Sequence, residues 1–146
     1  KKTDVWTYFH KNGKISSKEI YRMDTLISFQ LFNEEGNLQN DSIIPSKEPE
    51  FKGGERAWNN YCLNNIHFPG STQLINRDNV VVSIEFTINE EGKVEDVELV
   101  IPVHEVFDKK VIQFMKESPQ WTPAINHNRR VKYQSNFSVT FSQHFN

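Results

Sequence analysis

A β-hairpin over residues 80–101 is the feature that most constrains the fold of this chain. From Val80 to Ile88 the even positions are large and apolar, and the odd positions after Val81 are polar. A period of two predicts a strand with one buried face. Residues 89–93 then form a short polar segment that contains Gly92, as hairpin loops often do. Apolar residues resume on alternate positions at Val97, Leu99 and Ile101. Because a lone hairpin is marginal in water, further strands and a covering layer are expected.

The segment from Val131 to Ser142 supplies a third strand. Its odd positions are hydrophobic apart from Ser135, and its even positions are polar. Lys132 is its one charged residue before Phe141. An edge strand with so little charge is poorly protected against pairing with another chain, so it predicts strand addition by a partner. A covered edge, hidden by the linker or the N-terminal hairpins, is the structural alternative.

Two amphipathic helices are expected, one before the hairpin in the sequence and one after it. The first covers residues 55–66 and the second begins near Asp108, whose charge suits the positive end of the helix dipole. The apolar positions of the two helices recur at helical spacing: Trp58, Tyr61, Cys62 and Ile66 in the first, and Phe107, Val111, Phe114 and Met115 in the second. The expected fold is α+β, with two helices packed on one face of a three-stranded antiparallel sheet.

The N-terminal region contains an internal repeat. Residues 6–15 are echoed by residues 29–38, with Phe9 matching Phe32 and Gly13 matching Gly36. Each copy predicts a short aromatic strand, a tight turn and a second strand. The pattern resembles MORN-type repeats, and two unrelated hairpins are the alternative. Residues 45–50 contain two prolines and show no period, which predicts a linker. The expected organisation is therefore hairpin repeats over 1–44, a linker over 45–50 and a second domain over 51–146.

Composition and motifs give no indication of an enzyme. The formal net charge of −2 provides no field that would attract nucleic acid, and no apolar run has the length of a membrane span. The histidines show no metal-ligand spacing, so we expect each to be a surface or loop residue: His10, His67, His104, His127 and His144. Cys62 lies on an apolar helical stripe and is expected to be a core residue rather than a nucleophile. We expect no metal and no cofactor.

Several short motifs occur in an order that resembles the C-terminal domain of TonB, the periplasmic energy transducer of Gram-negative bacteria. The resemblance covers residues 49–141 and is of the Bacteroidetes type. Its motifs are Pro49-Glu50-Phe51-x-Gly53-Gly54, Phe68-Pro69, Phe86-Thr87-Ile88-x-x-x-Gly92, Phe107-Asp108 and Trp121-x-Pro123. Ala124 and Asn128 stand where the family commonly has glycine, which leaves the shape of that loop open.

The resemblance implies that the last strand receives the TonB-box peptide of an outer-membrane receptor, for transport across the outer membrane. The partner-binding residues it implies are Arg130, Val131, Lys132, Tyr133, Gln134, Ser135, Asn136, Phe137 and Ser138, together with His67, Phe68 and Pro69. It also implies a periplasmic or cell-envelope location, with an anchor upstream of Lys1 as one arrangement. The alternative function is a non-enzymatic envelope adaptor that uses the same fold to bind proteins or to form a homodimer.

Overall fold

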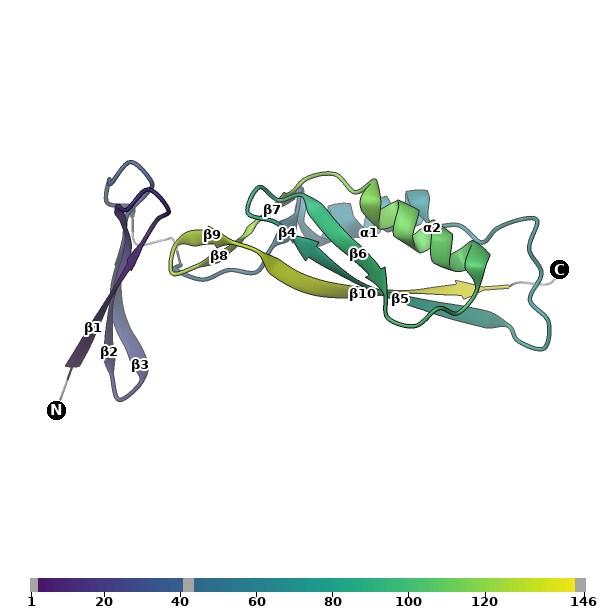
Figure 1. The fold of residues 1–146 in the computed structure, drawn as a ribbon, viewed down its shortest axis with the longest axis horizontal. Helices are drawn as coiled ribbons and strands as arrows, with labels where there is room; N and C mark the ends of the chain where they lie inside the picture. Colours follow the sequence, from purple (N-terminus) through teal and green to yellow (C-terminus); the bar gives the residue numbers. More distant parts are fainter. Residues whose placement is uncertain (1–2, 41–43, 144–146) are drawn as a thin grey trace. The chain divides into compact units, whose positions relative to one another are not determined.

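The computed structural model describes residues 3–40 and 44–143, which form two compact units (Figure 1). The first unit comprises the residues up to Glu48 together with Ala124–Val131. The second comprises Pro49–Pro123 and the chain from Lys132 onward. The division expected from sequence placed residues 124–131 in the second domain and residues 45–50 in a separate linker, whereas the contacts group residues 124–131 and the segment up to Glu48 with the first unit. His144 lies outside the described residues.

The second unit is organised around an antiparallel sheet with the strand order β10-β5-β6. Strand β5 (Asn79–Ile88) pairs with β6 (Val94–Leu99), which confirms the predicted hairpin, and with β10 (Tyr133–Ser142). The prediction was wrong for Ile101, which is 67% exposed. The pairing of β5 with β6 shifts between Glu85 and Thr87, and β6 ends before Ile101, so the alternation does not continue to that residue.

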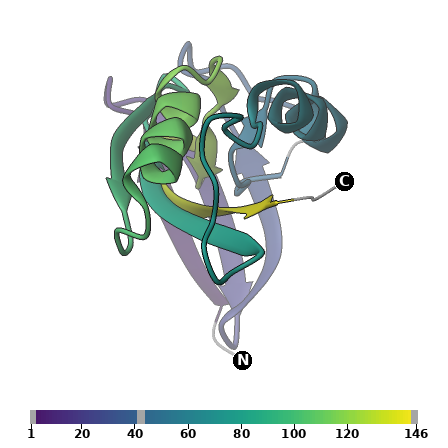
Figure 2. The ribbon, with the colours of Figure 1, turned by 90° about the vertical axis from the view of Figure 1, so that its right-hand side faces the viewer.

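The helices α1 (Gly54–Asn65) and α2 (Glu105–Lys116) lie next to each other in Figure 2. The rings of Tyr61 in α1 and Phe114 in α2 stack with centroids 4.8 Å apart, and the Tyr61 hydroxyl donates a hydrogen bond to the Phe114 carbonyl. Helix α2 begins where the His104 side chain accepts a hydrogen bond from the Val106 N–H, which is an N-cap. Each helix also presents aromatic side chains to the core.

The core of the second unit is apolar and draws on β5, β10 and α2. Its buried residues are Leu74, Val80, Val82, Ile84, Phe86, Ile88, Phe107, Val111, Phe114, Met115, Val139 and Phe141. Trp58, Tyr61 and Cys62 of α1 pack against this core but stay partly exposed. The inward set on β5 is the even series from Val80 to Ile88, as the sequence pattern predicts.

A short two-stranded sheet fastens the loop after α2 to the start of the second unit. Strand β4 (Glu50–Phe51) pairs with β7 (Trp121–Thr122). The Trp121 N–H also donates to the Gly92 carbonyl at 2.8 Å. A Cβ at Gly92 would lie 1.8 Å from the Trp121 carbonyl oxygen, so only glycine allows this approach. The hairpin loop thereby holds Trp121 in place.

The first unit contains a sheet of β1 (Thr3–Phe9), β2 (Ile15–Arg22) and β3 (Thr25–Leu31), in that order. The turns after β1 and β3 share one hydrogen-bond pattern, since the N–H groups of His10 and Asn33 donate to the carbonyls of Lys14 and Asn37. Residues 89–93 of the second unit form the same turn. A turn that occurs in both units does not by itself assign the N-terminal hairpins to a repeat family.

A second hairpin, β8 (Ala124–Asn126) and β9 (Arg129–Val131), completes the first unit. The sequence predicted a polar loop here, but the pair His127 and Asn128 both adopt positive φ and make a tight turn. The expected linker is hydrogen-bonded to this hairpin: Lys47 exchanges backbone hydrogen bonds with Ile125, and the Pro45 carbonyl accepts from the Asn128 N–H. The predicted third strand therefore divides at Lys132, and β10 begins at Tyr133.

Candidate functional site

Strand β10 lies at the edge of its sheet and is the first component of the candidate site. It pairs with β5 from Tyr133 to Ser142 in one unbroken register, and no other strand of the described chain pairs with its outer edge. Its even residues are exposed, and its odd residues face the core side. An unpaired edge of this length is a template for an additional strand.

The direction of the backbone groups along β10 follows from two hydrogen bonds. The Gln143 N–H donates to the Asp78 carbonyl, so this pair is hydrogen-bonded across β10 and β5. The Ser83 carbonyl accepts from Val100, on the β6 side, so Ser83 and its partner Ser138 are a non-hydrogen-bonded pair. Because antiparallel pairs alternate, the odd residues of β10 bond to β5. The N–H and C=O groups of the even residues point outward: Gln134, Asn136, Ser138 and Thr140.

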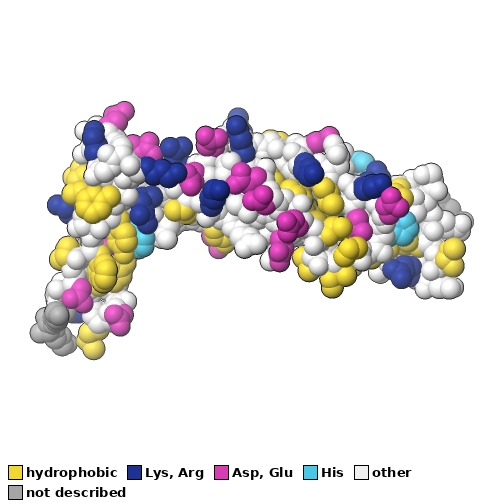
Figure 3. All heavy atoms as spheres, viewed as in Figure 1, with side chains coloured by type: hydrophobic (Ala, Val, Ile, Leu, Met, Phe, Trp, Pro, Cys, Tyr) yellow, Lys and Arg dark blue, Asp and Glu magenta, His cyan; other side chains and the backbone are white. Residues whose placement is uncertain are grey.

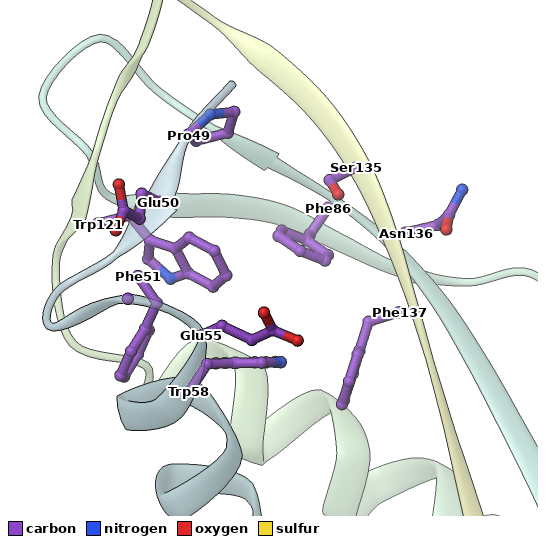
Figure 4. A pocket seen from close by; sticks show the side chains of 11 residues that line it. Pro49, Glu50, Phe51, Glu55, Trp58, Phe86, Trp121, Ser135, Asn136 and Phe137 are labelled. Carbon is purple, nitrogen blue, oxygen red and sulfur yellow. The ribbon is translucent and has the colours of Figure 1, made fainter. Parts of the chain in front are cut away.

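A groove of about 330 Å³ opens beside the first half of β10 (Figure 4). Ser135, Asn136 and Phe137 form its β10 wall. The rest of its lining comes from the β4 segment, the start of α1, β5 and β7: Pro49, Glu50, Phe51, Gly54, Glu55, Trp58, Phe86 and Trp121. The groove therefore adjoins the open edge of β10, and its residues can contact the side chains of a strand that pairs with this edge.

The groove is lined by an aromatic cluster with fixed ring geometry. The Trp58 ring centroid lies 5.1 Å from that of Trp121 and 5.1 Å from that of Phe137. Phe51 meets Trp121 edge-on, with ring centroids 5.4 Å apart. Edge-to-face and tilted contacts at these separations are favourable aromatic arrangements. The sequence places Trp58 on an apolar helical stripe and Trp121 in the Trp-x-Pro motif, but their convergence on β10 depends on the β4–β7 pairing and was not predictable from either pattern.

The structure brings together only part of the predicted partner-binding set. Residues 133–138 lie on β10, where Ser135, Asn136 and Phe137 line the groove, and Lys132 forms an ion pair with Glu95. Arg130 and Val131 instead belong to β9 in the first unit, where Arg130 pairs with Glu34. His67, Phe68 and Pro69 follow α1, where Phe68 packs on Phe107, and His67 lines a small cavity with Phe141 at the other end of β10.

A buried polar cluster in the first unit was missed by the sequence analysis. Glu19 is 1% exposed and accepts hydrogen bonds from Ser17, Tyr21 and the Nδ1 atom of His127. Burial opposes ionisation of Glu19, but these hydrogen bonds outweigh it, so the pKa of Glu19 is lowered from its ordinary value of 4.5. The hydrogen bond to Glu19 and burial raise the pKa of Tyr21 to about 12. This cluster ties the β8–β9 turn to the sheet.

The remaining side chains offer little for chemistry. Burial raises the pKa of the Cys62 thiol, which disfavours the reactive thiolate. Within residues 3–40 and 44–143, no group of three or more histidine, cysteine or acidic residues is arranged to hold a metal ion. Every helix in this described part is too short or too polar to cross a bilayer. On the face in Figure 3, acidic and basic side chains are interspersed.

Comparison with protein families matches residues 67–142 to the family described as Gram-negative bacterial TonB protein C-terminal. The match covers more than half of the chain, and the chain therefore belongs to this family. No match was found among curated proteins. The family is a non-enzymatic, transport-associated domain that is periplasmic in Gram-negative bacteria and binds outer-membrane receptors. Membership points to a TonB-like energy-transducer role.

Proposed function

We propose that this chain binds the TonB-box peptide of an outer-membrane receptor by strand addition along the open edge of β10, and so passes work to transport across the outer membrane. The observation that carries the proposal is the row of outward N–H and C=O groups at Gln134, Asn136 and Ser138, next to an aromatic groove. Main-chain hydrogen bonds provide affinity in this mode, and pockets for alternate side chains provide specificity.

The proposed binding surface runs along residues 133–138, with Trp58 and Trp121 in the groove wall. The exposed side chains of the even residues from Gln134 to Thr140 are all uncharged, so none repels an incoming strand by its charge. His67 lines a small cavity with Phe141 near the end of β10, so His67, Phe68 and Pro69 take part only if the peptide follows β10 that far. Arg130 and Val131 contribute only if the partner also contacts the first unit.

The finer features expected from sequence belong to the same proposal. These are two helices covering one face of the three-stranded sheet, a Bacteroidetes-type domain, N-terminal MORN-like hairpins and a periplasmic location. Division at the proline-bearing segment 45–50 is also proposed. The β8–β9 hairpin qualifies that division, because its partners lie in the first unit.

Proline substitutions on β10 test the proposal directly. Asn136→Pro removes an outward N–H and leaves every hydrogen bond to β5 intact, whereas Ser135→Pro removes one that bonds to β5. Calorimetric titration with TonB-box peptides should show that Asn136→Pro weakens binding by about tenfold or more, the equivalent of one or more backbone hydrogen bonds. Asn136→Ala keeps the N–H and should bind within about twofold of the parent chain.

Circular dichroism and thermal unfolding would establish that Asn136→Pro stays folded, and Ser135→Pro should lower the unfolding temperature. Sedimentation at rising concentration would detect pairing between copies of the chain, the alternative use of the same edge. If Asn136→Pro is folded and binds the peptide as tightly as Asn136→Ala does, strand addition at this edge is wrong. If Asn136→Pro abolishes self-association and no TonB-box peptide binds, the adaptor function replaces the transducer function.

A further inference from the structure

One position on the core-facing side of β10 leaves space for a partner side chain. The odd residues of β10 are Tyr133, Ser135, Phe137, Val139 and Phe141, and Ser135 alone is small. Ser135 lines the groove, next to Phe86 on β5, with which it pairs. In a strand added outside β10, the residue opposite Ser135 points its side chain to the same face of the sheet. That side chain would enter the groove.

The walls of this groove favour a long side chain with an apolar stem. Trp58, Trp121 and Phe137 present their rings around the space, as Figure 4 shows. Trp58 and Trp121 are only partly buried, so their rings are accessible to a ligand. Aromatic faces attract cations through the ring quadrupole, and they also cover methylene groups.

The charged side chains that line the groove are acidic. Glu50 and Glu55 line it, and no lysine, arginine or histidine does. In Figure 4 the Glu55 carboxylate is directed into the space between the rings of Trp58, Phe86 and Phe137. Glu55 is exposed at the start of α1, and the structure gives it no hydrogen-bond or ion-pair partner among the described residues. An aromatic surround with a carboxylate at its mouth complements a cationic group and repels an acidic one.

We infer that the peptide bound by β10 inserts a basic side chain, arginine or lysine, into this groove opposite Ser135. The aliphatic stem lies on Trp58 and Phe137, and the cationic head meets the Glu55 carboxylate. The inference rests on the proposed function, because it requires a strand on the open edge of β10. It adds a specificity that backbone pairing lacks, since strand addition alone accepts many sequences.

Host peptides that differ at one position test this inference. The probes are acetylated peptides Ser-Thr-Val-Thr-X-Thr-Val-Thr-Ser, with arginine, lysine, citrulline, leucine or glutamate at X, titrated into the whole chain by calorimetry. Citrulline has the shape of arginine without its charge. The arginine and lysine peptides should bind about tenfold tighter than the citrulline peptide, and the glutamate peptide should bind most weakly.

Two carboxylate variants provide a matched comparison. Glu55→Gln should lower the affinity ratio of the arginine to the citrulline peptide to about two- or threefold. Glu98→Gln makes the same charge change at an exposed position of β6, outside the groove lining, and should leave the ratio unchanged.

The outcomes separate this inference from the function on which it rests. If all five peptides bind alike, or if Glu55→Gln leaves the ratio unchanged, the basic-residue specificity is overturned. Strand addition still stands in that case, provided that Asn136→Pro abolishes binding of every peptide. If none of the peptides binds, strand addition of this kind and the specificity both fail.

Discussion

The two units bury different kinds of side chain. The second unit buries a set of large apolar residues around Ile84, Phe107 and Met115. In the first unit, Leu31 and Ala124 are the buried hydrophobic residues among those described, and the other buried positions are polar: His10, Ser16, Ser17 and Glu19. Asp108 is the buried polar residue of the second unit among those described. Its Oδ2 atom accepts hydrogen bonds from the N–H groups of Val103 and His104.

The two units therefore obtain their structural specificity from different interactions. An apolar core tolerates approximate partners, because burial is roughly proportional to area and is not directional. A buried polar cluster must satisfy each donor and acceptor, and it is costly when one is missing. In the first unit, the hydrogen-bond partners of the buried polar groups come from far along the chain. The His127 ring bonds to the Glu19 carboxylate, and the Asn128 side chain donates to the carbonyls of Ser16 and Phe32. The β8–β9 hairpin is therefore a structural part of the first unit.

The largest expected effect is in the apolar core. Phe86 is 3% exposed, and Phe86→Ala should reduce the free energy of unfolding by about 3–5 kcal/mol, the usual range for a buried aromatic residue. Its exposed neighbour provides the control, because Glu85→Ala should cost less than about 1 kcal/mol. Urea unfolding of both variants measures the difference. Equal losses would show that the strand register is wrong.

The next effect is in the polar cluster. Glu19→Ala leaves Ser17, Tyr21 and His127 without their common acceptor and should cost about 1–3 kcal/mol. Hydrogen exchange should show faster exchange in β1–β3, with β5 unchanged. Glu35→Ala removes an exposed glutamate from the same unit and should have little effect. If Glu19→Ala increased exchange in β5 more than in β2, the cluster would not act on the first unit alone, and the prediction would be wrong.

Substitutions of Asn128 test the contact between the β8–β9 hairpin and the rest of the first unit, and they should reduce the free energy of unfolding by a smaller amount. Its side-chain amide donates to the Ser16 and Phe32 carbonyls and to the Gln39 side chain, and its φ of 61° is left-handed. Asn128→Gly keeps the turn but loses these bonds, so it should cost about 1–2 kcal/mol. Asn128→Ala should cost about 0.5–1 kcal/mol more, because alanine disfavours this φ. Equal unfolding temperatures for the two variants would show that the turn carries no conformational strain.

The smallest effect is the pH dependence of the Glu19 contribution. The pKa of Glu19 is lower in the folded chain than its ordinary value of 4.5, so ionised Glu19 stabilises the fold above that pH. The contribution is lost as the pH falls below 4.5 and through the folded pKa. The difference in unfolding temperature between the parent chain and Glu19→Gln should therefore be constant at neutral pH and shrink in acid. A difference that grows as the pH falls would reverse the sign assigned to Glu19.

Much of the second unit could be predicted from residue patterns. The alternation of apolar and polar residues from Val80 to Ile88 and in β10 predicted which side chains are buried. In a strand with one buried face, every second side chain points to that face. The start and end of these elements were less predictable. Val131 continues the alternation of β10, but it pairs with Ala124 in the β8–β9 hairpin, and no local pattern separates the two uses. Ile101 likewise continued the pattern of β6 after the strand had ended.

The β5–β6 hairpin, the apolar sides of both helices and the weak charge protection of β10 follow from local residue patterns, because each depends on residues close together in the chain. Which N–H groups of β10 point outward depends instead on its pairing with β5, which no local pattern specifies. Tertiary packing also brings Trp58, Trp121 and Glu55 together beside Ser135, and it places His127 next to Glu19. Apart from Glu55 and Trp58, which are neighbours on α1, these residues are distant in sequence, and their contacts follow from strand pairing and packing, which leave no periodic signal along the chain.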